Sequence, residues 1–463
     1  MRDLGSDAAT TAGASTLSAP SVAEIESFTR RLALDTVGLE DAEMIDRLAA
    51  LETLRCATEA AQCETVADFV ISQRRAAAGR GVPAARRDRG VASQVALAMR
   101  QSPTRGQRQV GLAMTLRTEL ASTRAAFRAG HLDGYKATLI ARETACLTAV
   151  DRARVDEQLC ANPTVVERLS PRRLVGRLQR AAAQLDPAAV VKRRRRAEAD
   201  RHVSLRPAPE TMTTLSALLP LKAGVAVHAT LSRAARAAKA GGDPRSIGQL
   251  MADILTHRVV HPGLAETTTG TGTGGREAET SWAAATAPAV AAAVPAGTAS
   301  AVPVMVNLIV RDSVLLGDED GAGWVDGYGP VPGELIRGWV ADNLETGLAA
   351  WVRRVYEQPT TGKLVAMDST AVLFQGRLAE FIRVRDKVCR TPGCDAPIRH
   401  TDHVEARARG GPTTEDNGQG LCELCNHAKQ ADGWTARTVP GPTHTVETTT
   451  PTGHTYTSTA EPL

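Results

Sequence analysis

Four cysteines near the C-terminal end constrain this chain more than any other feature. They form two pairs, Cys389 with Cys394 and Cys422 with Cys425, and 27 residues separate the pairs. Each pair fits a tight turn that points two thiolates at one tetrahedral ion, and four thiolates leave zinc no open position. Four free buried thiols, the alternative, do not account for two paired spacings. The spacing therefore predicts a closed, structural zinc site.

Three polar residues between the two pairs are not explained by such a site. Asp402 and His403 are adjacent, and Asn417 follows after a glycine pair. A carboxylate can hold a hard divalent cation, and a neutral imidazole can deprotonate an attacking water. A strand-end ion pair is the alternative explanation for Asp402 and His403. Together with the cysteines, these residues indicate a hydrolytic centre that acts on phosphodiesters.

The same segment predicts a strand–strand–helix unit. We expect strands at 398–406 and 418–421, with a turn at 410–412 between them. A helix should start near Cys425 and carry Asn426 and Lys429.

Arginine is concentrated in one part of the chain. Residues 71–130 contain twelve arginines against two acidic residues, although the net charge of all 463 residues is only +4. A second basic run covers 192–196 and includes Arg193 and Arg194. Arginine clusters suit nucleic-acid phosphates because the guanidinium group binds phosphate oxygens in a bidentate manner. Solvated charged faces and a coding bias toward arginine are the alternative explanations.

The length predicts two or three domains, and the overall fold class is mostly α. Local composition and periodicity divide the chain into six parts. These are a disordered N-terminus (1–20), an arginine-rich helical domain (21–260), a Thr/Gly/Ala/Pro-rich linker (261–301), a small α+β segment (302–369), the cysteine module (370–437) and a disordered tail (438–463).

Several local features of the helical part can be read directly. Ser170 followed by Pro171 predicts a helix start, with serine as the cap. Residues 202–205 suggest a short strand, and we expect a helix over 209–219. The scattered cysteines Cys56, Cys63, Cys146 and Cys160 are expected to be small buried hydrophobic residues.

The cysteine module resembles the HNH endonuclease module, the ββα-metal nucleases, in its zinc-knuckle form. The matching pattern is C-x4-C, D-H, G-G-x-T, N and C-x2-C-N-x2-K within 389–429. The region upstream resembles the DUF222 (13E12-repeat) proteins of actinobacteria. That resemblance rests on the segments L-D-P (185–187), G-D-P-R (242–245) with Gln249 and Asp253, and G-Y-G-P (327–330).

The resemblance to HNH endonucleases implies a role for each motif residue. His403 would be the general base, Asp402 would bind the catalytic Mg²⁺ or Mn²⁺, and Asn417 would fix the loop and orient the histidine. At the third motif position the chain has Asn426 where other families have histidine, and His427 is one residue further on. Asn426 offers a neutral oxygen ligand and is the favoured candidate, with His427 as the alternative.

These observations predict a metal-dependent DNA endonuclease. Lys429, Arg193 and Arg194 are candidate DNA contacts, although Lys429 is equally explained as a solvated surface lysine. A zinc-stabilised DNA-binding protein without catalysis is the main alternative, and an RNA-directed nuclease is a third. The sequence offers no membrane-spanning segment, so we expect a cytoplasmic location, and it leaves a homodimer open.

Overall fold

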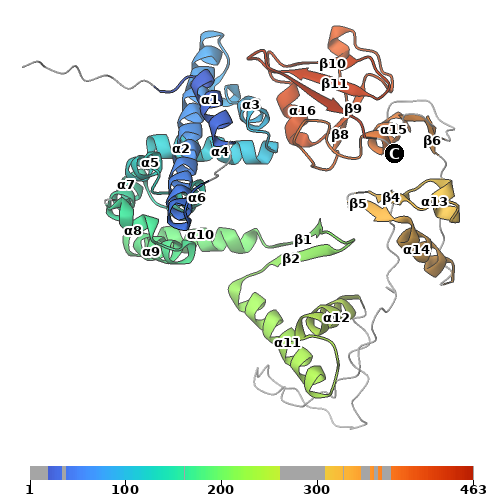
Figure 1. Cartoon of the computed structure of the whole chain (residues 1–463), viewed down its shortest axis with the longest axis horizontal. Helices are drawn as coiled ribbons and strands as arrows, with labels where there is room; N and C mark the ends of the chain where they lie inside the picture. The colour runs from blue at the N-terminus through green and yellow to red at the C-terminus, as the bar shows by residue number, and fades with distance from the viewer. Residues whose placement is uncertain are drawn as a thin grey trace, which may run out of the picture.

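The computed structural model describes residues 19–33, 38–160, 162–260, 308–326, 328–345, 355–358, 363–367 and 377–461, and it is mostly helical, as predicted (Figure 1). The expected linker at 261–301 and nearly all of the expected disordered N-terminus at 1–20 lie outside the described residues.

The N-terminal half is an assembly of helices, as the sequence predicts. The elements are α1 (Val22–Leu32), α2 (Asp41–Gly79), η1 (Ala84–Arg86), α3 (Val91–Ala98), α4 (Pro103–Thr118), α5 (Ala121–Arg128), α6 (Gly134–Glu143), α7 (Ala149–Cys160), α8 (Pro163–Glu167), α9 (Pro171–Leu185) and α10 (Pro187–Ala199). The predicted cap of α9 is present, because Oγ of Ser170 accepts a hydrogen bond from the backbone N–H of Arg173 (3.4 Å).

One apolar core holds most of these helices together. Its largest fully buried side chains come from α5, α6, α9 and the turns between helices, and they include Leu120, Phe127, Leu132, Ile140 and Leu174. Among the scattered cysteines, the structure buries Cys56, Cys63 and Cys160 and leaves Cys146 half-buried. The prediction of small buried hydrophobic cysteines is therefore confirmed for three of the four.

The helix predicted over 209–219 is wrong. Strands β1 (His202–Pro207) and β2 (Thr213–Leu218) form an antiparallel hairpin there, and β1 confirms the predicted strand. Glu210 and Thr211 adopt positive φ angles of 59° and 57° at the turn, which a helix cannot accommodate. The threonines at the start of β2 also favour a strand, because their β-branched side chains fit a pleated surface.

The chain after this hairpin forms smaller units. Helices α11 (Leu221–Ala240) and α12 (Ile247–Val260) pair around Ala235, Leu250 and Ile254. The next elements are β3 (Leu308–Ile309), α13 (Asp312–Leu316), β4 (Ala322–Val325), β5 (Gly329–Pro332), α14 (Gly333–Glu345), β6 (Val355–Gln358) and β7 (Lys363–Met367). Their antiparallel sheets, ordered β3-β4-β5 and β6-β7, match the predicted small α+β segment.

The C-terminal module has the predicted strand–strand–helix order. Helix α15 (Arg377–Asp386) leads into β8 (His400–His403), η3 (Arg407–Arg409), β9 (Gly418–Leu421) and α16 (Glu423–Lys429). Strands β8 and β9 pair antiparallel, with Asp402 opposite Gln419 and His403 opposite Gly418. The register therefore places the Asp-His dipeptide at the last two residues of the first strand.

The disordered tail predicted at 438–463 is wrong as far as residue 461, the last that the structure describes. Strands β10 (Thr435–Val439), β11 (Thr445–Thr449) and β12 (Thr455–Thr459) form an antiparallel sheet. Threonine hydroxyls pair across its strands, and the guanidinium of Arg390 donates to the backbone oxygens of His444 (3.0 Å) and Ser458 (2.8 Å). The polar composition suggested disorder, whereas β-branched threonines and a buried arginine anchor stabilise a sheet here.

The module docks on helix α3 of the helical domain (Figure 1). Leu97 of α3 packs against Ala431 and Trp434, which follow α16. Arg89 donates to the backbone oxygen of His427 (3.2 Å) and to Oε1 of Gln430 (3.1 Å). A Cβ atom on Gly90 would lie 2.7 Å from Nε1 of Trp434, so only glycine permits this close approach.

Among the described residues, no helix is both long enough and apolar enough to span a bilayer.

Candidate metal centre and catalytic residues

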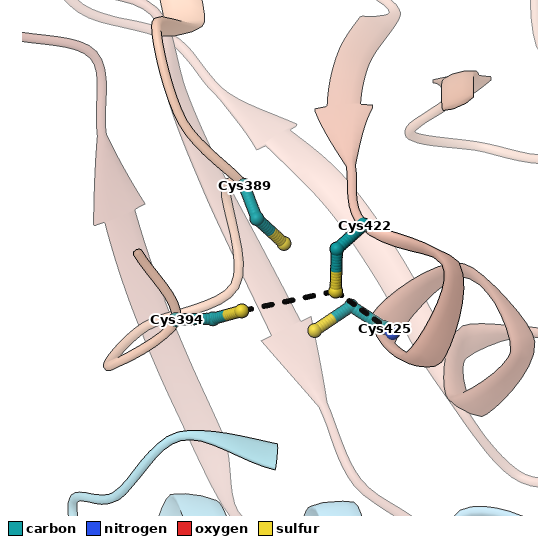
Figure 2. A group of neighbouring side chains, drawn as sticks. All are labelled: Cys389, Cys394, Cys422 and Cys425. Carbon is teal, nitrogen blue, oxygen red and sulfur yellow. Dashed lines mark hydrogen bonds between the residues drawn. The ribbon is translucent and has the colours of Figure 1, made fainter. Parts of the chain in front are cut away.

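The four cysteines of the predicted zinc site form one buried cluster. Their sulfur atoms all lie within 4.8 Å of one another, and no cysteine is more than 7% exposed. Figure 2 shows the four side chains converging, two from the loop after α15 and two from the start of α16. The sulfurs of Cys394 and Cys422 lie 3.8 Å apart. A zinc ion about 2.3 Å from four tetrahedral sulfurs requires a similar spacing of roughly 3.8 Å. The cluster can therefore hold a structural metal such as zinc.

Helix α16 begins at this cluster. The Sγ of Cys422 accepts a hydrogen bond from the backbone N–H of Cys425 (3.5 Å), so a cysteine caps the helix. The pKa of Cys422 is held well below its usual range, first by hydrogen bonding with Cys389 and then with Cys394 and Cys425. Hydrogen bonding with Cys389, and then with Cys394 and Cys422, raises the pKa of Cys425. Metal binding to such a cluster releases the remaining thiol protons.

A buried ion pair connects α15 to the hairpin. Nε of Arg385 donates to Oδ1 of Asp386 (2.7 Å), and both side chains are at most 4% exposed. Arg385 also donates to the backbone oxygens of Glu415 (2.6 Å) and Gly418 (2.7 Å). Oδ2 of Asp386 accepts from the backbone N–H of Gly420 (2.7 Å). These bonds fix β9 and the loop before it.

Asp402 and His403 stand together at the end of β8 and are both partly exposed. Nε2 of His403 lies 2.9 Å from Oγ1 of Thr413, across the loop that connects the strands. Oδ2 of Asp402 accepts from the ammonium of Lys429 on α16 (2.6 Å). The histidine thus faces the connecting loop, and the aspartate bonds to the helix.

Asn417 holds the connecting loop closed. Its Oδ1 accepts from the backbone N–H of Glu405 (2.9 Å), and its Nδ2 donates to the backbone oxygens of Glu405 (3.1 Å) and Pro412 (2.7 Å). Gly411 is required in this loop, because a Cβ atom there would lie 1.9 Å from the oxygen of Glu405. Pro412 directly precedes Thr413, so the hydrogen bonds of Asn417 also set the position of Thr413, which contacts His403.

Asn426 and His427 differ in their surroundings. Asn426 is 8% exposed, and its buried Oδ1 has no hydrogen-bond partner among the described residues. His427 is exposed, and its backbone oxygen accepts from Arg89. A buried oxygen without a partner is unfavourable unless a ligand satisfies it. Asn426 therefore offers an unsatisfied oxygen, whereas the exposed ring of His427 offers nitrogen atoms, and which of them serves as the third motif residue stays a prediction.

The two arginines predicted as DNA contacts lie on α10, in another part of the molecule. Arg193 donates to the backbone oxygen of Glu143 (3.0 Å) and forms an ion pair with its buried carboxylate (3.0 Å). Arg194 is largely exposed and pairs with Glu198 (3.1 Å). The structure does not bring either arginine into the group formed by the motif residues, and their contact with DNA stays a prediction.

Sequence reasoning missed two structural partners of this site. His444 is buried, and its Nε2 lies 2.9 Å from the backbone oxygen of Asp416, the residue before Asn417. Burial first, and then the nearby Arg385, lower the pKa of His444 to about 4. The ion pair between Lys429 and Asp402 was also missed. Its signal was present in the sequence, because Lys429 lies three residues after Asn426 and so on the same face of the helix.

Comparison with known protein families places this site in context. The model of the domain of unknown function DUF222 matches residues 48–386, nearly three quarters of the chain. The chain belongs to the DUF222 family. In this DUF222 protein the HNH endonuclease model matches residues 387–432, which contain both cysteine pairs, β8, β9 and α16. Both resemblances seen in the sequence are confirmed.

The relatives of this DUF222 protein carry no functional description. The uncharacterized proteins Rv3776 and Rv2100 of Mycobacterium tuberculosis (strain ATCC 25618 / H37Rv) are each 42% identical to it over 85 residues, 18% of this chain. The matched segments cover only 16% and 15% of those proteins. No solved structure matches the chain.

Proposed function

We propose that this DUF222 protein is a metal-dependent HNH endonuclease that hydrolyses phosphodiester bonds in DNA. One observation carries the proposal: the segment matched by the HNH model folds as strand–strand–helix and gathers the motif residues on that frame. Asp402 and His403 end the first strand, Asn417 closes the connecting loop, and Asn426 lies on the helix.

Asp402 and Asn426 offer oxygen donors of the kinds that a hard divalent cation prefers. Asp402 supplies a partly exposed carboxylate, and the buried Oδ1 of Asn426 lacks a hydrogen-bond partner within the described residues. Oxygen ligands of these two kinds suit Mg²⁺ or Mn²⁺. When bound, such an ion stabilises the negative charge that develops on the phosphate during hydrolysis.

His403 is proposed as the general base. A neutral imidazole accepts a proton from water and so raises its nucleophilicity toward phosphorus. The contact with Thr413 restricts the ring, and Asn417 holds the loop that carries Thr413. Asn417 would therefore orient the base without taking part in bond making.

The helical domain is proposed to contribute affinity for the DNA backbone. Several arginines of the basic stretch form ion pairs, such as Arg74 with Asp88 and Arg124 with Glu64. Others are exposed next to α3, including Arg100 and Arg105. Arg100 follows α3, the helix on which the module docks, and Arg105 lies on α4, which packs against α3. Phosphate binding there would fall steeply with increasing salt.

Cleavage of supercoiled plasmid tests the proposal. Purified protein is incubated with Mg²⁺, Mn²⁺ or EDTA, and nicked and linear products are quantified. We expect metal-dependent cleavage that His403→Ala reduces by roughly a hundredfold or more, since general-base catalysis contributes about 10²–10⁴-fold. His400→Ala is the matched control, because His400 is an exposed histidine at the other end of β8 and should leave the rate unchanged.

Asn426→Ala and His427→Ala compare the two candidates for the third motif position. The proposal predicts a large loss of cleavage rate for Asn426→Ala and little change in that rate for His427→Ala.

Cleavage by His403→Ala at the wild-type rate would rule out His403 as the general base. Salt-sensitive DNA binding without cleavage in any metal would instead support a zinc-stabilised DNA-binding protein.

A further inference from the structure

The ammonium of Lys429 connects both residues at the end of β8 to helix α16. It donates to Oδ2 of Asp402 (2.6 Å) and to the backbone oxygen of His403. The lysine side chain is only 11% exposed, and that of Asp402 is 26% exposed. A solvated surface lysine would not be buried in this way. The arrangement requires another explanation.

The position of Lys429 on the helix relates it to Asn426. Lys429 is the last residue of α16, and Asn426 lies three residues earlier, nearly one turn. The ammonium occupies one oxygen of Asp402, while within the described residues Oδ1 accepts no hydrogen bond. One carboxylate oxygen is thus fixed by the protein, and the other remains for a cation.

The cost of removing Lys429 and Asp402 from water argues against an ion pair that serves stability alone. A partly buried ion pair of this kind is weak evidence for a contribution to stability, because removing two charges from water offsets much of their attraction. A role in fixing geometry explains why the lysine bonds to the aspartate and to the adjacent backbone oxygen together.

We propose that Lys429 is a positioning residue that fixes the Asp402 carboxylate and the end of β8 for catalysis. This inference rests on the proposed endonuclease function. Lys429 would not contact the phosphate, because its ammonium is already bonded within the protein. Its positive charge would also weaken cation binding at Asp402, since like charges repel. Lys429 would therefore fix the carboxylate of Asp402 and at the same time lower its affinity for the cation.

Lys429→Met tests this role in the full-length, zinc-loaded protein. We expect kcat for plasmid cleavage to fall roughly tenfold or more, while KM stays within about twofold. In calorimetric titration of the same variant, Mn²⁺ should bind about threefold more tightly or better, because the repelling charge is gone. A merely structural role would weaken both catalysis and metal binding. Lys222→Met, which changes an exposed lysine of α11, is the control.

A double-mutant comparison isolates the partner. If Lys429 acts through Asp402, adding Lys429→Met to Asp402→Asn should change both kcat and the Mn²⁺ affinity by less than about twofold. Lys429→Gln keeps hydrogen-bond donors without the charge and serves as a second variant if the methionine does not fold. Zinc content and circular dichroism verify the fold of each variant.

Each result separates this inference from its alternatives. A raised KM or DNA Kd with unchanged kcat would show a phosphate contact and overturn the positioning role. Independent, multiplicative effects of the two substitutions would overturn it as well. If the wild type cleaves nothing, the endonuclease proposal fails, yet the Mn²⁺ titration still tests the lysine. Unchanged Mn²⁺ affinity in Lys429→Met would then overturn the inference itself.

Discussion

The helical domain and the C-terminal module are held together by different forces. The helical domain buries a continuous set of apolar side chains, including Leu120, Phe127 and Ile140. In the module, the cluster around the metal centre consists of the four cysteines and Leu421. Ile382 and Val404 are buried outside this cluster, and polar anchors such as the ion pair of Arg385 with Asp386 connect the elements of the module.

This difference means that the two regions should respond to different perturbations. Burial of apolar surface stabilises the helical domain regardless of metal and is nearly independent of pH. A module with so small an apolar core needs a metal or buried polar network to fold. Three experiments test this contrast, beginning with the largest expected effect.

Removal of the metal should unfold the module and leave the helical domain folded. The apparent free energy of structural zinc binding is about 10–16 kcal/mol in small zinc domains, more than a module of this size can replace. Cys422→Ser should abolish zinc binding and make the region after residue 387 sensitive to proteolysis. The measurement combines zinc content, circular dichroism and limited proteolysis. Cys146→Ser, at a half-buried cysteine of the helical domain, should change none of them. A protease-resistant module in Cys422→Ser would contradict the role of the metal.

Shortening a side chain in the helical core should destabilise the helical domain and leave the module folded. Leu120 is fully buried, so Leu120→Ala should lower the free energy of unfolding of the helical domain by roughly 2–5 kcal/mol. Zinc content should remain that of the wild type. Denaturant unfolding monitored by circular dichroism measures the effect, and Leu48→Ala, at a leucine that is 61% exposed, is the matched control. Equal effects at the two positions would show that this core does not carry the stability.

Acid should weaken the module through His444. Its pKa is lowered to about 4 in the folded chain, so between the ordinary histidine pKa of about 6.5 and 4 the unfolded chain binds a proton that the folded chain does not. Stability should therefore be unaffected by this group above about pH 6.5 and should fall as the pH drops toward 4, by at most about 3 kcal/mol.

His444→Gln removes this titration while keeping a hydrogen-bond donor near Asp416. Thermal unfolding of the module at several pH values should then show a shallower loss in acid than the wild type. His454→Gln, at an exposed histidine directly before β12, should retain the wild-type slope. The same slope in both variants would show that other groups cause the acid sensitivity.

The sequence was most informative where spacing is fixed by chemistry. Two cysteine pairs that meet in one cluster, an Asp-His dipeptide at a strand end and a helix starting at the second pair all follow from local rules. The prediction of a helix over 209–219 was wrong because Glu210 and Thr211 adopt positive φ angles at a turn. Glutamate and threonine do not normally indicate such a turn in a sequence. The sheet formed by residues 435–459 was missed because its threonines read as polar, although Arg390 and His444 supply buried polar contacts.

Contacts between distant segments were beyond local reasoning. No pattern near Arg89 indicates a bond to His427, and the match of Gly90 to Trp434 depends on both partners being in place. The ion pair of Lys429 with Asp402 lies between these cases. The spacing of Lys429 three residues after Asn426 predicts that both lie on one face of the helix. The low exposure of the lysine, in contrast, depends on how α16 packs against β8.

The docking of the module on α3 also affects how this chain can vary in length. The bond from Arg89 to His427 closes a loop of 338 residues. The entropy of closing such a loop rises only with the logarithm of its length, so about forty additional residues would shift the docking free energy by roughly 0.1 kcal/mol. Insertions in the surface loops of the stretch between the two docked partners, outside its helices and strands, should therefore change the docking of the module little. The lengths of these loops can change while the module stays attached to α3.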